Sequence, residues 1–283
     1  MHDIGILCLA QNNSTTNYVR LAYLQCLSVK LTNPGLPYAL VTDSAGADTL
    51  SEAQQSCIDH LIILPVDWAK DQEWKQRNDW QLGNLSPFKE TIKVEADLLF
   101  TRDISHWWRM LRHRDVVLST GCKNYLGQQS LVRNYRKTFD VNGLPDIYSG
   151  LMYWRRSIQS ANFFTIVKRV YQHWDVLREL LQQCNDPGSN DMVYAVASLL
   201  AGVDNVTLPA ADFFNFAHMK PAINRLAEAR AWHASFTVDV VPPDIRIAGN
   251  QQMYPFHYYD KNWPTDSLIK EYEHARLRIS KST

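Results

Sequence analysis

Short apolar runs alternate with helix-length segments through the first half of the sequence, and this alternation limits the chain to few folds. Residues 4–10 read IGILCLA, a run that predicts a buried strand. Residues 17–30 carry apolar side chains at helical spacing after the polar loop NNSTT. Further apolar runs at 37–42 and 60–66 predict two more strands. Because strands that alternate with helices usually pair in parallel beneath them, we predict an α/β layered fold with a mixed, mostly parallel central sheet flanked by helices.

The second half continues the pattern with longer helices. It predicts strands at 94–100, 115–119, 147–154 and 206–209, and helices at 157–185 and 189–201. Such sheets bind ligands beyond the carboxyl ends of their strands, where the strand order reverses. We therefore expect the loop after the first strand, the residues after the second strand and the segment around residues 95–97 to converge on one site.

Composition narrows the class of partner. The chain has 283 residues, and its 29 basic and 29 acidic side chains cancel, which gives no overall attraction to nucleic acid or an anionic membrane. The five cysteines are odd in number and show no C-x-x-C spacing, which argues against a disulfide framework and a zinc site. The N-terminus shows no signal-peptide pattern, and no apolar run has the length of a membrane span. The sequence thus predicts a cytoplasmic protein with no membrane span.

Two acidic residues stand one residue apart in an apolar stretch near the middle of the chain. Residues 94–100 read VEADLLF, so in an extended strand Glu95 and Asp97 would share one face. Two such carboxylates repel each other and lose hydration. A divalent cation offsets both costs, because Mg²⁺ and Mn²⁺ bind carboxylate and phosphate oxygens. The alternative is that both residues end the strand at the solvent, and the spacing alone leaves both interpretations open.

A histidine and a lysine stand near the C-terminal end, in the segment YPFHYYDKNW at 254–263. A neutral imidazole such as that of His257 can bind Mn²⁺, and the ammonium of Lys261 can offset the charge of a diphosphate. Alternatively, His257 packs as one member of an aromatic cluster with its neighbours. Considered together with the acidic pair, ligation of a metal is the favoured interpretation.

These segments resemble those of GT-A glycosyltransferases. Residues 89–103, KETIKVEADLLFTRD, resemble the DxD region with Glu95 in place of the first aspartate. Residues 254–263 resemble a shortened form of the His-x-x-Gly-x-x-Lys-Pro-Trp element of the glycogenin and bacterial galactosyltransferase enzymes, without its glycine and proline. The resemblance implies one Rossmann-like GT-A domain over residues 1–283, with a nucleotide-binding half (1–120) and an acceptor-binding half (121–283) that carries a metal-binding C-terminal tail.

The same resemblance implies roles for individual residues. It implies Mn²⁺ or Mg²⁺ held by Glu95, Asp97 and His257, and a catalytic Lys261 at the diphosphate of a nucleoside-diphosphate-sugar donor. Asp191 resembles the carboxylate that binds donor-sugar hydroxyls, and we predict a catalytic role for it. Candidate donor-binding residues are Ala10, Asn12, Tyr18, Asp43, Lys89, Gly150 and Lys220, of which Lys220 could instead approach the acceptor.

Each of these assignments has a plainer alternative. Asn12 and Asp191 can simply cap the helices that follow them. Gly150, in the segment YSGLMY that resembles the glycine strand of the family, either lets a ligand approach the backbone or marks a bulge. The lysines can be solvated surface charges.

The predicted reaction is transfer of a sugar to a hydroxyl acceptor, with retention of anomeric configuration. The acceptor could be a glycan, a protein or a hydroxylated base in phage DNA, because the pattern is also similar to phage-encoded GT-A proteins; the compartment would then be the host cytoplasm. Basic residues of the polar segment 123–141, such as Arg133, Arg136 and Lys137, would contact an anionic acceptor.

One alternative function is that of a nucleotidyltransferase, which the loop LAQNNSTTN disfavours because it lacks glycine and lysine. The other is a non-catalytic nucleotide- or carbohydrate-binding module.

Overall fold

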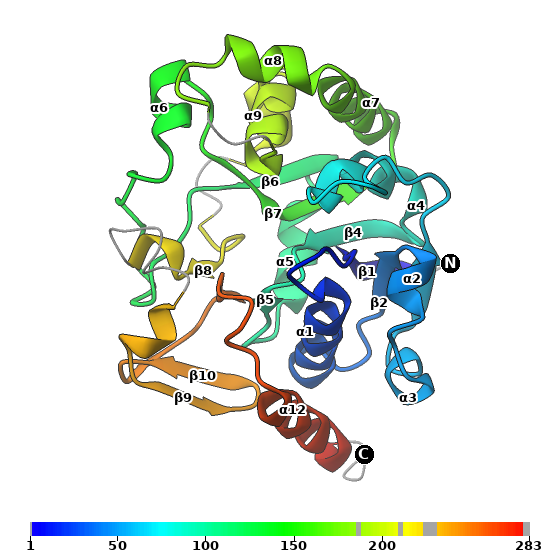
Figure 1. Cartoon of the computed structure of the whole chain (residues 1–283), viewed down its shortest axis with the longest axis vertical. Coiled ribbons are helices and arrows are strands. Elements are labelled where there is room, and N and C mark those ends of the chain that lie inside the picture. The colour runs from blue at the N-terminus through cyan, green and yellow to red at the C-terminus, as the bar shows by residue number, and fades with distance from the viewer. Residues whose placement is uncertain (1, 185–187, 209–211, 223–230, 280–283) are drawn as a thin grey trace.

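A six-stranded sheet forms the centre of the protein (Figure 1). In the computed structural model, which describes residues 2–184, 188–208, 212–222 and 231–279, its strands lie in the order β3-β2-β1-β4-β7-β6. β7 runs antiparallel to both of its neighbours, and the remaining pairs are parallel. The strands are β1 (His2–Leu9), β2 (Tyr38–Thr42), β3 (His60–Ile63), β4 (Phe88–Val94), β6 (Val116–Thr120) and β7 (Ile147–Arg155). The predicted mixed, mostly parallel sheet is confirmed.

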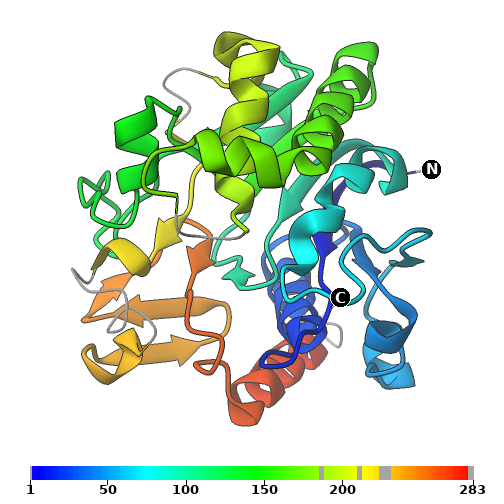
Figure 2. The same cartoon turned by 45° about the horizontal axis from the view of Figure 1, so that its top comes forward.

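Helices cover both faces of this sheet, as Figures 1 and 2 show for α7 to α9 on one face and α1 on the other. The longer helices are α1 (Tyr18–Thr32), α7 (Ile158–Gln172), α9 (Asn190–Ala201) and α12 (Asp266–Ile279). The shorter ones are α2 (Ser44–Ala47), α3 (Glu52–Gln55), α4 (Leu82–Leu85), α5 (Ser105–Leu111), α6 (Lys137–Asn142), α8 (Trp174–Leu180) and α10 (Val203–Val206), with the 3₁₀ segments η1 (Lys75–Gln81), η2 (Lys220–Ala222) and η3 (Trp232–Ala234). No described helix combines the length and apolarity needed to cross a membrane.

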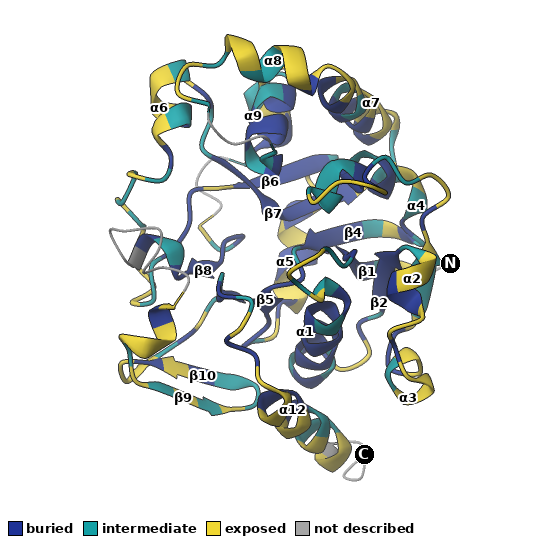
Figure 3. Cartoon of the chain, viewed as in Figure 1, coloured by how far each residue is buried: buried dark blue, intermediate teal, exposed yellow. Residues whose placement is uncertain are grey.

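The sheet separates two hydrophobic cores. Successive side chains of β1 point to opposite faces, so Ile6 and Cys8 pack in the core with α1 and α12, whereas Leu7 and Leu9 pack in the core with α7 and α9. Figure 3 shows the strands and the inner sides of these helices as buried. Burial on both faces explains why residues 4–9 of β1 and the strand β2 read as apolar runs in the sequence.

Two small sheets complete the fold. β5 (Leu98–Leu99) pairs antiparallel with β12 (Phe256–His257), and β12 pairs parallel with β8 (Ala217–His218). β9 (Val238–Val241), β10 (Asp244–Ile247) and β11 (Asn250–Gln251) form an antiparallel sheet. The pairing of β12 with β5 sets His257 opposite Leu98 and so brings the C-terminal segment beside the acidic pair.

The structure differs from the sequence prediction at three elements. The predicted strand 94–100 is wrong, because β4 ends at Val94 and a turn, closed by a 3.2 Å bond from the Leu98 amide to the Glu95 carbonyl, separates it from β5. The predicted helix 157–185 divides at His173 into α7 and α8, and Trp174 then packs against Trp74. The predicted strand 206–209 is absent from its described part, since Val206 ends α10 and residues 207 and 208 lie in no strand; residue 209 lies outside the described residues.

Candidate active site

A cavity of about 920 Å³ opens where β1 and β4 end. Ala10 follows β1 and Glu95 follows β4, and both residues line it. From β1 the chain continues to β2 and β3 on one side, whereas β4 lies on the other, so the strand order reverses between these two strands. This reversal leaves a crevice between the loops that follow the strands, and its volume suits a ligand of nucleotide size.

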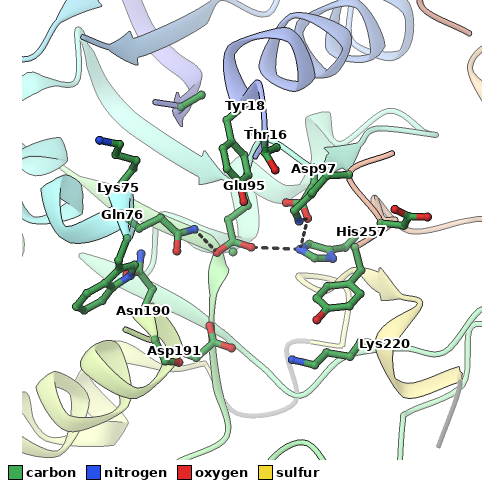
Figure 4. Close-up of a pocket in the computed structure, with 18 of the residues that line it drawn as sticks. Thr16, Tyr18, Lys75, Gln76, Glu95, Asp97, Asn190, Asp191, Lys220 and His257 are labelled. Carbon is green, nitrogen blue, oxygen red and sulfur yellow. Dashed lines mark hydrogen bonds and ion pairs between the residues drawn. The ribbon is translucent and has the colours of Figure 1, made fainter. Parts of the chain in front are cut away.

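Glu95, Asp97 and His257 meet at the base of this cavity (Figure 4). The Nε2 atom of His257 lies 3.2 Å from Oε2 of Glu95 and 3.3 Å from Oδ2 of Asp97. One potential ligand atom from each residue lies within 4.8 Å of the other two. The turn after β4 supplies the two carboxylates and β12 supplies the imidazole, so two distant stretches of sequence build one cluster.

The charges of the cluster depend on one another. Burial alone would lower the pKa of His257, but the carboxylates of Asp97 and Glu95 outweigh it and raise the pKa to about 9. Burial likewise opposes ionisation of Asp97, yet His257 and Lys261 hold the pKa of that carboxyl far below its usual range. Lys261 forms an ion pair with Asp97. Without a metal, the two cationic side chains therefore balance the two carboxylates.

The three side chains fit a divalent cation. Octahedral Mg²⁺ has bonds of about 2.0–2.1 Å, so its adjacent ligand atoms lie roughly 3 Å apart. The distances of 3.2 and 3.3 Å from His257 to the two carboxylates are close to this spacing. Two carboxylates and one imidazole also form a donor set that Mn²⁺ accepts.

Gln76 and Gly150 lie directly beside the carboxylate of Glu95. Gln76, in η1, donates a 3.2 Å hydrogen bond from Nε2 to Oε1 of Glu95. Gly150, in β7, lies so close that a Cβ atom there would be 2.8 Å from Oε2 of Glu95. Gly150 also lines the cavity, and its lack of a side chain leaves room first of all for the glutamate.

Asp191, at the start of α9, lies on the other side of the cavity in a network of its own. Its Oδ1 accepts hydrogen bonds of 2.8 Å from the amide of Ser149 and 2.9 Å from the Ser149 hydroxyl. Its Oδ2 accepts a 2.8 Å bond from Arg136, which also pairs with Asp146. Since a carboxylate offers about four acceptor positions, Asp191 keeps room for a further donor such as a sugar hydroxyl.

A buried ion pair between Lys93 and Asp79 lies next to the residues that position Glu95 and Asp191. Lys93, in β4, is 1% exposed and donates 2.9 Å bonds to Asp79 and to the carbonyl of Ser149. Asp79 also accepts a 3.1 Å bond from Asn190, the residue before Asp191. Lys93 therefore links the strand that carries Glu95 to the segments that position Asp191.

Most of the predicted site residues line the cavity. These are Ala10, Tyr18, Glu95, Asp97, Gly150, Asp191, Lys220, His257 and Lys261. The structure brings them together from both predicted halves of the chain. Their roles in binding and catalysis stay predictions.

Three predicted donor-binding residues do not line the cavity. Asn12 accepts a 3.0 Å bond from the amide of Val19 near the start of α1, which matches its plainer interpretation. Asp43 caps α2 through a 2.6 Å bond from Gly46 and accepts another from Gln11. Lys89 lies near the opposite end of β4 from Glu95 and pairs with Asp3 at 2.7 Å. Lys89 is thus too far along its strand to act beside the acidic pair.

The sequence reasoning missed several residues that position the site. Gln76 belongs to a polar and aromatic segment without periodicity, so no local signal indicated it. Arg136 was expected on a polar acceptor loop, but it is 3% exposed and pairs with Asp146 and Asp191. Arg133 is likewise paired with Asp140 and Asp146. These two guanidinium groups therefore hold protein carboxylates.

Several solved structures that share this architecture are glycosyltransferases. The glycosyltransferase GlyE of Streptococcus pneumoniae TIGR4 superposes with a TM-score of 0.56 at 12% identity, over 99% of this chain and 65% of that chain. The galactosyltransferase LgtC, solved in complex with donor and acceptor sugar analogs, gives a TM-score of 0.51 at 14% identity, over 97% of this chain and 95% of that one. The chain has a GT-A glycosyltransferase fold.

A third GT-A neighbour is WbbM, a bifunctional glycosyltransferase, with a TM-score of 0.54 and 11% identity over 99% of this chain. This chain spans 51% of WbbM and 65% of GlyE, which is less than two thirds of the length of either protein. No protein-family model matches the sequence, and no curated protein matches it either. The likeness therefore establishes the GT-A fold, and the activity must be argued from the site.

Proposed function

We propose that this protein is a metal-dependent glycosyltransferase, which moves a sugar from a nucleoside-diphosphate-sugar to a hydroxyl group. The observation that carries the proposal is the meeting of Glu95, Asp97 and His257 within 4.8 Å of one another, at the strand-order reversal of a GT-A fold. A purely structural ion-pair cluster would not need to line a cavity of about 920 Å³. A metal site for a diphosphate does, because the metal must contact the ligand.

In this proposal Glu95, Asp97 and His257 hold Mn²⁺ or Mg²⁺. The bound cation supplies positive charge that stabilises the leaving diphosphate. Lys261 forms an ion pair with Asp97, and with a cation held there its ammonium would be available to bind the diphosphate. Ala10 and Tyr18, at the end of β1 and the start of α1, are placed to contact the nucleotide.

The sugar is then placed toward Asp191. The carboxylate of Asp191 accepts a hydrogen bond from a sugar hydroxyl, while Ser149 and Arg136 fix its orientation. The bond from the anomeric carbon to the diphosphate oxygen breaks, a bond to the acceptor oxygen forms, and the acceptor proton passes to the leaving diphosphate. We propose retention of configuration, because this proton transfer to the donor needs no protein base on the opposite face of the sugar.

Thermal unfolding in the presence of candidate donors tests the proposal. UDP-, GDP-, CMP- and dTDP-sugars are added with Mn²⁺, and a donor bound to the native state raises the melting temperature. The best donor is then assayed for nucleotide release. We expect Asp97→Asn to abolish both responses, whereas the matched control Asp239→Asn, on an exposed position of β9, keeps them.

Two results would reject the proposal. One is the absence of stabilisation and turnover with every donor. The other is release of pyrophosphate from a nucleoside triphosphate and a sugar phosphate, which indicates a nucleotidyltransferase.

A further inference from the structure

A second, smaller cavity of about 130 Å³ adjoins the main one. The two cavities share the residues Tyr148, Ser189, Asp191, His218 and Lys220. The metal-site residues and Lys261 line only the main cavity. The smaller cavity thus lies on the Asp191 side, beyond the proposed position of the donor sugar.

Lys220 stands where the two cavities meet. Figure 4 shows it on the opposite side of His257 from Asp97, with its amine toward Asp191. The ammonium lies 5.1 Å from the ring centroid of Tyr135 and 5.1 Å from that of Tyr259. Two aromatic rings stabilise a cation without cancelling its charge, and the N–H groups remain able to donate hydrogen bonds.

The other cations near this junction already have anionic partners. Lys261 pairs with Asp97, and Arg136 pairs with both Asp146 and Asp191. His218 accepts a 3.3 Å hydrogen bond at Nδ1 from the backbone amide of Lys220. Within the described part of the chain, no carboxylate lies at ion-pair distance from Lys220. Among the described residues around the smaller cavity, Lys220 is thus the cation without a carboxylate partner.

The rings that hold Lys220 are themselves fixed. The hydroxyl of Tyr135 lies 2.6 Å from that of Tyr148, and Arg136 packs on the Tyr148 ring at 4.1 Å. Tyr259 has a φ of 62°, a left-handed conformation that is sterically costly for a side chain of this size. Such conformations persist where the surroundings over-determine them, often at functional sites. The ammonium is therefore held in one place.

We propose that Lys220 binds an anionic group of the acceptor, so that the acceptor is a molecule with a carboxylate or a phosphate near the hydroxyl that receives the sugar. This inference rests on the proposed function and adds the chemical class of the acceptor. The donor diphosphate would be bound by the cation and Lys261, which lie on the opposite side of His257 from Lys220. An acceptor anion bound by Lys220 would lie beside Asp191 and within reach of the donor sugar. The rings of Tyr135 and Tyr259 would then contact the rest of the acceptor.

A kinetic experiment tests the charge preference. Matched acceptors are glucose, glucuronate and glucose 6-phosphate, each supplied with the best donor and Mn²⁺. We expect at least one anion to exceed glucose in kcat/KM by about tenfold or more, as one charged hydrogen bond provides. Lys220→Met should remove this preference and leave the donor KM in acceptor-free hydrolysis unchanged. Lys220→Arg should retain it, and Lys270→Met, an exposed lysine of α12, serves as the control.

A binding experiment keeps the inference testable without turnover. Lysine amines are labelled by reductive ¹³C-methylation, and the Lys220 signal is assigned by its loss in Lys220→Met. Glucuronate or glucose 6-phosphate should shift this signal with the diamagnetic Mg²⁺ present, whereas glucose should not. The carboxylate and phosphate arms show which anion is preferred.

Three outcomes would overturn the inference. The first is an equal preference for glucose and the anions. The second is an anion titration that leaves the Lys220 signal unmoved. The third is a response to pyrophosphate alone, together with a raised donor KM in Lys220→Met, which would assign Lys220 to the donor. If no nucleotide-sugar is bound or turned over, the proposed function fails. The anion titration is independent of that result and still shows whether Lys220 binds anions.

Discussion

The aspartates Asp97 and Asp191 line one cavity but are held by different kinds of partner. Asp97 pairs with Lys261 and His257, two cations from the C-terminal segment. Asp191 accepts hydrogen bonds from Ser149 and Arg136, which are fixed in β7 and beside α6. In the proposed metal site a cation would replace the partners of Asp97 without disturbing the core, whereas the partners of Asp191 belong to the scaffold. Asp97 would therefore exchange its partners, while Asp191 is held in position.

The strongest test of this difference is Asp97→Asn. We expect kcat/KM for sugar transfer to fall by roughly a thousandfold, because the neutral side chain binds the cation poorly and several kcal/mol of charge stabilisation are lost. The free energy of unfolding without metal should also fall, because the buried cations Lys261 and His257 lose a carboxylate partner. Steady-state kinetics and urea unfolding measure the two effects. A variant with unchanged kcat/KM would place the metal elsewhere.

Arg136→Met tests the other side of the cavity. It leaves Asp146 and Asp191 without their buried cation, and we expect the free energy of unfolding to fall by about 2–3 kcal/mol. The loss is smaller than for a fully buried pair, because the two carboxylates are 31% and 27% exposed. Urea unfolding measures it, with the exposed Lys137→Met as control. Equal stability of both variants would show that Arg136 does not belong to the scaffold.

The pH dependence of metal binding tests whether His257, one of the two cationic partners of Asp97, is a metal ligand. The pKa of His257 in the metal-free protein is raised to about 9, above its usual 6.5, so the imidazole is protonated at neutral pH and must lose a proton to bind a metal. Mg²⁺ affinity should therefore increase about tenfold per pH unit, or about a hundredfold between pH 6.5 and 8.5, and level off near pH 9.

The free energy of unfolding measured without metal should change in the opposite direction and fall as the pH rises. The protonated His257 stabilises the metal-free fold fully below pH 6.5, and this contribution is lost as the pH rises through about 9. Calorimetric titration of Mg²⁺ at several pH values measures the affinity. His257→Ala should flatten the profile, and a flat profile in the unaltered protein would exclude His257 as a ligand.

The smallest effect is expected from Lys89→Met. Lys89 is 62% exposed in its side chain and pairs with an exposed Asp3, and such pairs contribute little to the free energy of unfolding. Donor KM should also stay unchanged, since Lys89 lies outside the cavity. Thermal unfolding and donor titration check both expectations. A raised donor KM would restore the sequence-based prediction that Lys89 binds the donor.

The local sequence was sufficient for the elements that bury both faces. The run at residues 4–10 and the helical pattern at 17–30 predict β1 and α1 within a few residues, because their apolar periodicity reports the sheet and helix directly. Glu95 and Asp97 stand out because two carboxylates in an apolar run are chemically unusual, whereas His257 is indicated by the resemblance of its segment to a GT-A element. Gln76 and Arg136, which contact Glu95 and Asp191, carry no such signal, since polar residues in irregular segments look alike whether they hold a site or face water.

The amino-acid order by itself determined the layered α/β architecture and the identity of the acidic pair, because hydrophobic period and residue type are local properties. The tertiary structure decided that Glu95 and Asp97 lie in a turn at the end of β4, that β12 carries His257 to them, and that Arg136 is buried between two aspartates. It also decided that Lys89 is distant from the cavity while Lys220 faces it. The approach of His257 depends on the pairing of β12 with β5, which joins residues more than a hundred positions apart, and no local pattern encodes such a pairing.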